Sequence, residues 1–120
     1  MIDHVGFEVS DLDRSTRFYD AVFFALGARR MHESESAVAY GIKDPMIWFV
    51  VRGRPPAPGY GHLALQASGK AAVDAAHAAG LGHGGSDDGA PGQRPQYGRR
   101  YYAGYLLDPD GLRVEVVSRK

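Results

Sequence analysis

A chain of 120 residues with 44% apolar side chains is long enough for one domain with a substantial core and too short for several. Fourteen Lys and Arg residues balance fourteen Asp and Glu residues, so the net charge does not favour nucleic acid or an anionic membrane as a partner. The sequence contains no cysteine, which excludes disulfides, thiol nucleophiles and thiolate metal sites. A small molecule or a second subunit is the expected partner.

Membrane insertion and secretion are not expected from the sequence. No apolar run approaches the roughly 20 residues that a membrane-spanning helix requires. The first residues also lack a basic segment followed by an apolar stretch, which a secretory signal would show. We therefore expect a cytoplasmic protein.

The first half of the sequence predicts the element order βαβββ. Residues 4–9 alternate between two faces as a strand does, and the capping side chains of residues 10–13 precede apolar residues at helical spacing as far as Gly27. Three short strands are then predicted, at residues 28–32, 37–42 and 46–51. Residues 52–60 are rich in proline and glycine and are expected to form a linker.

The second half begins in the same way. A strand is predicted at residues 61–67 and a helix from about residue 70 to residue 79, closed by Gly80. Glycine and proline between residues 82 and 98 predict a long loop with room for a short strand at most. The chain then forms a hairpin through the tight turn of residues 108–111, with strands at 101–107 and 112–117.

These elements predict a single α+β domain over residues 1–120, built from two similar units. The units comprise residues 1–51 and 61–120, with the linker of residues 52–60 between them.

One pattern of residues occurs at the start of both units. His4 and His62 each open a strand in which the first, third and fifth residues share one face, and those strands end in Glu8 and Gln66. Glu115 lies on the closing strand of the second unit. Two imidazoles and one carboxylate can bind a divalent metal and leave positions open for a substrate. The repeat therefore suggests a metal site.

The segments around these residues resemble the vicinal oxygen chelate superfamily. The resemblance rests on Asp-Leu-Asp-Arg-Ser-x-x-Phe-Tyr, on Tyr-Gly-His-Leu-Ala-Leu and on Asp-Pro-Asp-Gly-x-x-Val-Glu-Val-Val. The superfamily includes glyoxalase I, extradiol dioxygenases, fosfomycin resistance transferases and bleomycin-binding proteins, and residues 88–102 resemble an uncharacterised bacterial branch of it. The resemblance implies two βαβββ repeats whose curled half-barrel sheets form a shared cup.

The resemblance also implies which residues bind the metal. His4, His62 and Glu115 match three ligand positions of the superfamily. The fourth position holds a glutamate in glyoxalase I enzymes, and Trp48 stands there in this chain. Because that glutamate also moves the proton in glyoxalase chemistry, the tryptophan argues against lactoylglutathione formation. The expected metal is Fe, Mn, Ni or Zn, and a site without metal stays open as an alternative.

Proton transfer would require further groups near the metal. We expect Tyr105 first and Glu8 second as catalytic residues. The other residues expected in the pocket are polar or aromatic: Tyr40, Trp48, Gln66 and Tyr101. The remaining histidines, His32, His77 and His83, are expected at the surface, and Arg94, Arg99 and Arg100 in a solvated turn in preference to an acidic-substrate site.

Two functions are consistent with these residues. The first is a metal-dependent enzyme, dioxygenase-like or isomerase/lyase-like, acting on a small molecule with adjacent oxygens. The second is a binding protein of the bleomycin-resistance type that holds an aromatic or cationic ligand without metal. A homodimer is expected in both cases, and the sequence leaves open whether the units pair within one chain or between chains.

Overall fold

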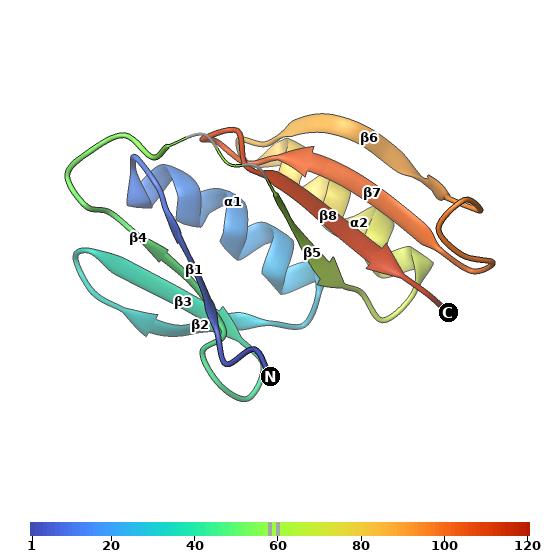
Figure 1. Ribbon diagram of the computed structural model, residues 1–120, viewed down its shortest axis with the longest axis horizontal. Coiled ribbons are helices and arrows are strands. Elements are labelled where there is room, and N and C mark those ends of the chain that lie inside the picture. Colours follow the sequence, from blue (N-terminus) through green and yellow to red (C-terminus); the bar gives the residue numbers. More distant parts are fainter. Residues whose placement is uncertain (58, 60) are drawn as a thin grey trace.

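The computed structural model describes residues 1–57, 59 and 61–120, and contains two four-stranded sheets and two helices (Figure 1). Residues 58 and 60 of the predicted linker, and with them Tyr60 of the second motif, lie outside this description. Each sheet and one helix come from one half of the chain, and we call these halves the first and second modules.

The first module contains residues 5–50. Its elements are β1 (Val5–Glu8), α1 (Leu12–Ala25), β2 (Arg29–Glu33), β3 (Ala37–Gly41) and β4 (Ile47–Val50). The sheet order is β1-β4-β3-β2, in which β1 and β4 are parallel and the other pairs antiparallel. Helix α1 begins where predicted, because the Asp11 carboxylate accepts a hydrogen bond from the Arg14 amide at 3.0 Å.

The second module repeats this arrangement. Its elements are β5 (His62–Gln66), α2 (Lys70–Gly82), β6 (Ser86–Gln93), β7 (Tyr102–Leu107) and β8 (Arg113–Ser118). The sheet order is β5-β8-β7-β6, again with one parallel pair, β5 and β8. The prediction of two βαβββ repeats is confirmed.

Strand β6 is longer than the sequence suggested. The segment predicted as a long loop contains an eight-residue strand, Ser86–Gln93, at the edge of the second sheet. Its register against β7 shifts on both sides of Gly89, whose φ is +149°. A Cβ atom there would also lie 3.0 Å from Cδ2 of Tyr105. An irregular edge strand tolerates glycine and proline, because only one side of it must form ladder hydrogen bonds.

Both helices pack into one core that the two modules share. Buried residues of α1, α2 and both sheets belong to the same cluster, including Phe18, Val73 and Val116. A Cβ atom at Gly80 of α2 would lie 3.0 Å from Cε1 of Phe18, so the missing side chain allows the helices to approach. Neither of these two helices, within the part of the chain described, is long and apolar enough to cross a membrane.

The turn between β7 and β8 fastens the second module to α1. Buried Asp108 accepts a hydrogen bond from the Tyr19 hydroxyl at 2.7 Å, and also from the amides of Asp110 and Leu112. Asp110 in turn accepts from Arg14 Nη2 at 2.8 Å. These contacts hold the two modules of one chain together through α1, and leave one face of each sheet away from the shared core.

Candidate functional site

The open face of the second sheet carries the predicted residues of the second module. In the strand register, Glu115 of β8 lies between Ala64 of β5 and Tyr105 of β7. Because side chains alternate along a strand, residues 62, 64 and 66 and residues 101, 103 and 105 share this face with Glu115. The opposite face, with Val114 and Val116, packs into the core.

Glu115 lies at the centre of a three-residue cluster. Its Oε1 atom is 3.0 Å from Nε2 of His62, and its Oε2 atom accepts a hydrogen bond from the Tyr101 hydroxyl. Glu115 is only 2% exposed, whereas the His62 side chain is 44% exposed. The partners satisfy a carboxylate whose burial would otherwise be costly, and His62 keeps the pair accessible from outside.

Tyr101 should titrate far above an ordinary tyrosine. Burial, followed by the hydrogen bond to Glu115, raises the pKa of Tyr101 to about 12. The folded state therefore holds this proton more tightly than the unfolded state does, and the resulting stability is present below pH 10 and is lost as the pH rises towards 12. The difference in phenolate absorbance between wild type and Tyr101→Phe should develop near pH 12. A step near pH 10 would contradict the contact with Glu115.

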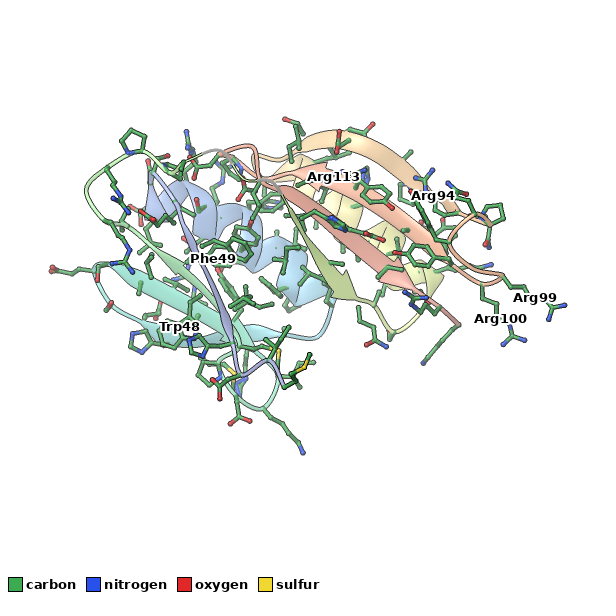
Figure 2. All side chains as sticks on the ribbon, viewed as in Figure 1. Trp48, Phe49, Arg94, Arg99, Arg100 and Arg113 are labelled. Carbon is green, nitrogen blue, oxygen red and sulfur yellow. The ribbon has the colours of Figure 1, made fainter. Side chains whose placement is uncertain are left out.

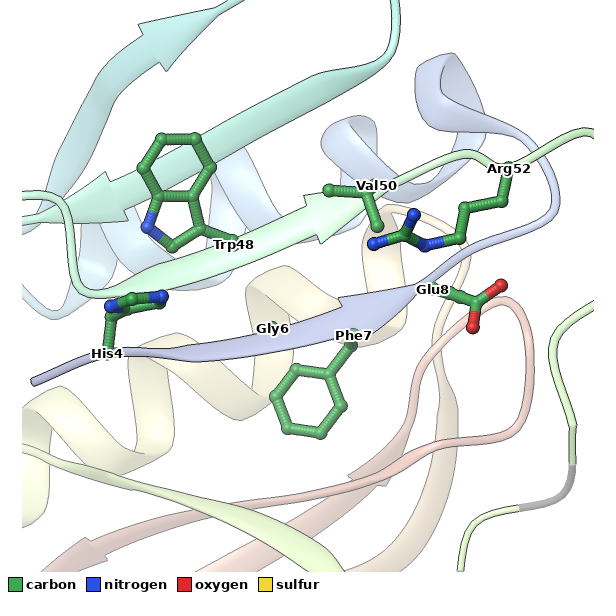
Figure 3. A pocket seen from close by; sticks show the side chains of 7 residues that line it. All are labelled: His4, Gly6, Phe7, Glu8, Trp48, Val50 and Arg52. Atoms are coloured by element: carbon green, nitrogen blue, oxygen red, sulfur yellow. The ribbon is translucent and has the colours of Figure 1, made fainter. Parts of the chain in front are cut away.

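His4 lies on the open face of the other sheet. Its ring centroid is 6.4 Å from that of Trp48, and its Nδ1 atom is 2.6 Å from Asp3 Oδ1. Figure 3 shows His4, Trp48 and Glu8 around a shallow pocket of about 360 Å³, with Phe7 pointing to the other side of β1. The indole also lies against His32, with ring centroids 4.9 Å apart. The first sheet therefore offers an aromatic surface beside an imidazole.

The predicted metal ligands are brought together only in part. No group of three His, Asp or Glu side chains suited to a metal ion occurs among the residues that the structure describes. His62 and Glu115 are adjacent, whereas His4 lies on the other sheet. A divalent ion could bind at the imidazole nitrogen and carboxylate oxygen of this pair, in place of the proton between them. The pair fits such an ion, and one chain supplies two of the three predicted ligands at one place.

The other residues predicted near the site have definite partners. Tyr105 lies under two guanidinium groups, with the Cζ atoms of Arg113 and Arg94 at 4.1 and 5.4 Å from its ring centroid. Glu8 accepts two hydrogen bonds of 3.0 Å from Arg54, which hold the pKa of its carboxyl below the usual value. Gln66 is exposed on the face that carries His62.

The prediction that Tyr40 lines the pocket is wrong. In the register of β3 and β4, Trp48 faces Ala39 and Tyr40 faces Ile47, so Tyr40 and Trp48 lie on opposite sides of the sheet. Tyr40 is fully buried in the core, and its hydroxyl donates to Asp20 at 2.6 Å. The residue therefore stabilises the packing of α1 on the first sheet.

His77 is buried and not at the surface as predicted. It is 5% exposed, and its Nε2 atom lies 3.0 Å from Asp87 Oδ1 and 3.1 Å from the carbonyl oxygen of Tyr105. The imidazole thus ties α2 to β6 and β7. The sequence did not indicate this role, because alanine occurs on both buried and exposed faces of helices and so does not show which face of α2 is buried.

Two arginines of the open face were not recognised in the sequence. Arg113 lies two residues before Glu115 on β8, so strand alternation places it on the same face, and Arg119 directly follows the end of β8. Arg119 Cζ is 4.7 Å from the ring centroid of Tyr101. The even spacing of both arginines from Glu115 could have indicated that they lie near this carboxylate, once the extent of β8 was known.

Comparison with known proteins places the chain in a family. Residues 1–116 match the family model of the Glyoxalase/Bleomycin resistance protein/Dioxygenase superfamily. The chain belongs to this superfamily. None of the curated proteins with which the sequence was compared matches it. The resemblance that the sequence motifs suggested is thereby confirmed.

Solved structures of the superfamily share the fold. A glyoxalase/bleomycin resistance protein from Albidiferax ferrireducens T118 is 32% identical, with a TM-score of 0.87 and 96% of each chain covered. A glyoxalase-related enzyme from Fulvimarina pelagi is 20% identical, with a TM-score of 0.78 and coverage of 98% of this chain and 87% of that one. A fosfomycin resistance protein from Mesorhizobium loti is 24% identical, with a TM-score of 0.71 and coverages of 98% and 91%. The last two show the fold alone.

Proposed function

We propose that this superfamily protein is a divalent-metal-dependent enzyme acting on a small molecule that carries two adjacent oxygens. The observation that carries the proposal is the contact between His62 and Glu115, 3.0 Å apart, on the open face of the second sheet. Imidazole and carboxylate together suit Fe(II), Mn(II), Ni(II) or Zn(II). A bound metal would act as a Lewis acid towards the substrate oxygens.

The third ligand would be His4 of a second copy of the chain. His4 and the His62–Glu115 pair lie on different sheets, and the Tyr19–Asp108 contact fastens the two modules together through their core side. His4 directly precedes β1 and His62 is the first residue of β5, and both strands lie at sheet edges. Dimerisation that joins the first sheet of one copy to the second sheet of another would bring the three ligands together. Members of the superfamily often dimerise, which supports this arrangement.

Tyr105 and Glu8 would have different roles in such a site. Burial raises the pKa of Tyr105, so its hydroxyl stays protonated at neutral pH and can donate a hydrogen bond to a substrate oxygen. Glu8 stays a carboxylate because Arg54 holds its pKa down, and it can accept a proton only weakly. Gln66 would orient the substrate beside His62, and Trp48 would exclude water above His4. Trp48 in place of a carboxylate disfavours the usual glyoxalase I reaction. The cytoplasmic location stays a prediction.

Metal content tests the proposal. Protein purified without an affinity tag or added metal should contain about one metal per chain, and His62→Ala should contain almost none, since one of three ligands is lost. His83→Ala is the matched control, because that exposed imidazole contacts the Ala79 carbonyl at the end of α2, away from the His62–Glu115 pair. Elemental analysis by mass spectrometry measures all three proteins. Wild-type protein that stays metal-free after anaerobic reconstitution with Fe(II), Mn(II), Ni(II) and Zn(II) would refute the metal site.

A metal-free binding protein is the second candidate. The pocket lined by His4 and Trp48, whose indole also contacts His32, suits an aromatic or cationic ligand. In that case Trp48→Ala should weaken ligand binding while a chelator has no effect. Loss of binding on addition of EDTA would exclude this candidate.

A further inference from the structure

Arg94 is a half-buried cation on the open face of the second sheet. Its Nη2 atom donates to the carbonyl oxygens of Ala90 at 2.6 Å and Ala103 at 3.3 Å, and its Cζ atom lies over the Tyr105 ring. No carboxylate lies within 4.0 Å of its guanidinium among the described residues. Its Nε atom is buried and has no hydrogen-bond partner in the described part of the chain. Neutral groups therefore hold this positive charge in place.

The neighbouring arginines divide into two kinds. Arg113 shares the Tyr105 ring with Arg94, but its charge is balanced by Asp88 at 2.8 Å. Arg119 lies over Tyr101 and, like Arg94, has no carboxylate within 4.0 Å in the described part of the chain. Figure 2 shows Arg94 and Arg113 over the second sheet, whereas Arg99 and Arg100 extend into solvent beyond the strands. Of the three arginines predicted in a solvated turn, Arg94 alone lies on the open face.

These cations stand beside the proposed metal pair. The Tyr105 ring beneath Arg94 belongs to the residue that pairs with Glu115 across β7 and β8. The Tyr101 ring beneath Arg119 belongs to the residue that donates its hydroxyl to the Glu115 carboxylate. Glu115 contacts Tyr101 and His62, and among the described residues no ion pair joins it to Arg94 or Arg119.

We propose that Arg94, supported by Arg119, binds an oxyanionic group of the substrate, a carboxylate or a phosphonate, next to the His62–Glu115 pair. A guanidinium that is partly removed from water and has no counter-ion loses hydration that an oxyanion can replace through charge-assisted hydrogen bonds. The cation–π contact with a tyrosine ring restricts the arginine side chain and so lowers the entropic cost of binding. The inference rests on the proposed function in taking this face as the substrate side, and it narrows the substrates to acids.

Binding of simple acids tests the subsite separately from the metal. Benzoate, phenylphosphonate and the neutral isostere benzamide are titrated into the full chain by calorimetry or ligand-observed NMR, with and without EDTA. At least one of the two anions should bind about tenfold more tightly than benzamide, the gain expected for charge-assisted hydrogen bonds. The anion that binds more tightly identifies the oxyanion. Because the measurement includes metal-free protein, failure of metal loading leaves this result unaffected.

Variants then assign the preference to individual arginines. Arg94→Gln should lose the tenfold preference for the anion, and Arg99→Gln, an exposed arginine of the same connection, should keep it. Arg119→Gln should weaken the preference two- to threefold and tests the proposal independently if Arg94→Gln fails to fold. Equal binding of anions and benzamide by wild-type protein would overturn the proposal, and so would a full preference retained in folded Arg94→Gln.

Discussion

A heterodimer of His4→Ala and His62→Ala chains should bind metal although neither variant does so alone. If His4 of one copy completes the His62–Glu115 pair of the other, the heterodimer contains one site with both mutations and one site with neither. We expect roughly half of the wild-type metal content in heterodimers purified through two different tags, measured by elemental analysis. Pairing within one chain predicts no metal, because each chain then carries one mutated ligand.

A reciprocal heterodimer provides the control. A chain with both substitutions, His4→Ala and His62→Ala, is combined with a wild-type chain. Sites shared between copies would then all lack one histidine, so no metal should bind, whereas pairing within a chain would leave the wild-type site intact. Metal in this control and none in the first heterodimer would place the three ligands in one chain. It would also show that the two modules of one chain leave the relative placement seen in Figure 1 when the site forms.

Asp108→Ala should strongly reduce the free energy of unfolding. The substitution removes the acceptor of the buried Tyr19 hydroxyl and of two amides in the turn between β7 and β8. A buried hydroxyl left without a partner costs about 1–3 kcal/mol, and we expect a total loss of about 3 kcal/mol in the free energy of unfolding. For a chain of this length the Tm should fall by roughly 10 °C. Denaturant and thermal unfolding measure both quantities.

Asp108→Asn is the matched variant. Its amide can accept from the two turn amides and donate to Tyr19, so the loss should stay below about 1 kcal/mol. Burial raises the pKa of Asp108, which means that the folded state holds this proton more tightly than the unfolded state. The contribution of Asp108 to stability is therefore lost as the pH rises from the ordinary pKa of an aspartate through the raised pKa of the folded state. Over this pH range the free energy of unfolding of the Asn variant should rise relative to that of wild type. Equal losses in the Ala and Asn variants would show that the contact between modules contributes little.

Local sequence signals predicted most of the elements. The β1 and β5 strands, the Asp11 cap of α1 and the turn at residues 108–111 follow from side-chain alternation and capping chemistry, which act over a few residues. The length of β6 was underestimated, because glycine and proline signal a loop, whereas an edge position makes their backbone acceptable.

Residues whose environment depends on distant elements could not be placed in this way. Tyr40 was assigned to the pocket although the register with β4 turns it into the core, and His77 was assigned to the surface although β6 and β7 cover it. Register is set by pairing between strands, which a single strand does not reveal. Arg94 and Arg99 look alike in the sequence, and only their packing shows that Arg94 lies over the Tyr105 ring whereas Arg99 is exposed.

The repeat, the superfamily and the residue types of the candidate metal site could be predicted from the sequence, because they depend on local periodicity and on motifs within each module. Which of these residues meet depends on tertiary packing. The contact of Tyr19 with Asp108 and the packing of α1 on α2 fasten the modules together through their core side. His62 therefore contacts Glu115, while His4 stays on the other sheet. Long-range packing set this arrangement, because the relative placement of two modules depends on contacts between residues far apart in the chain.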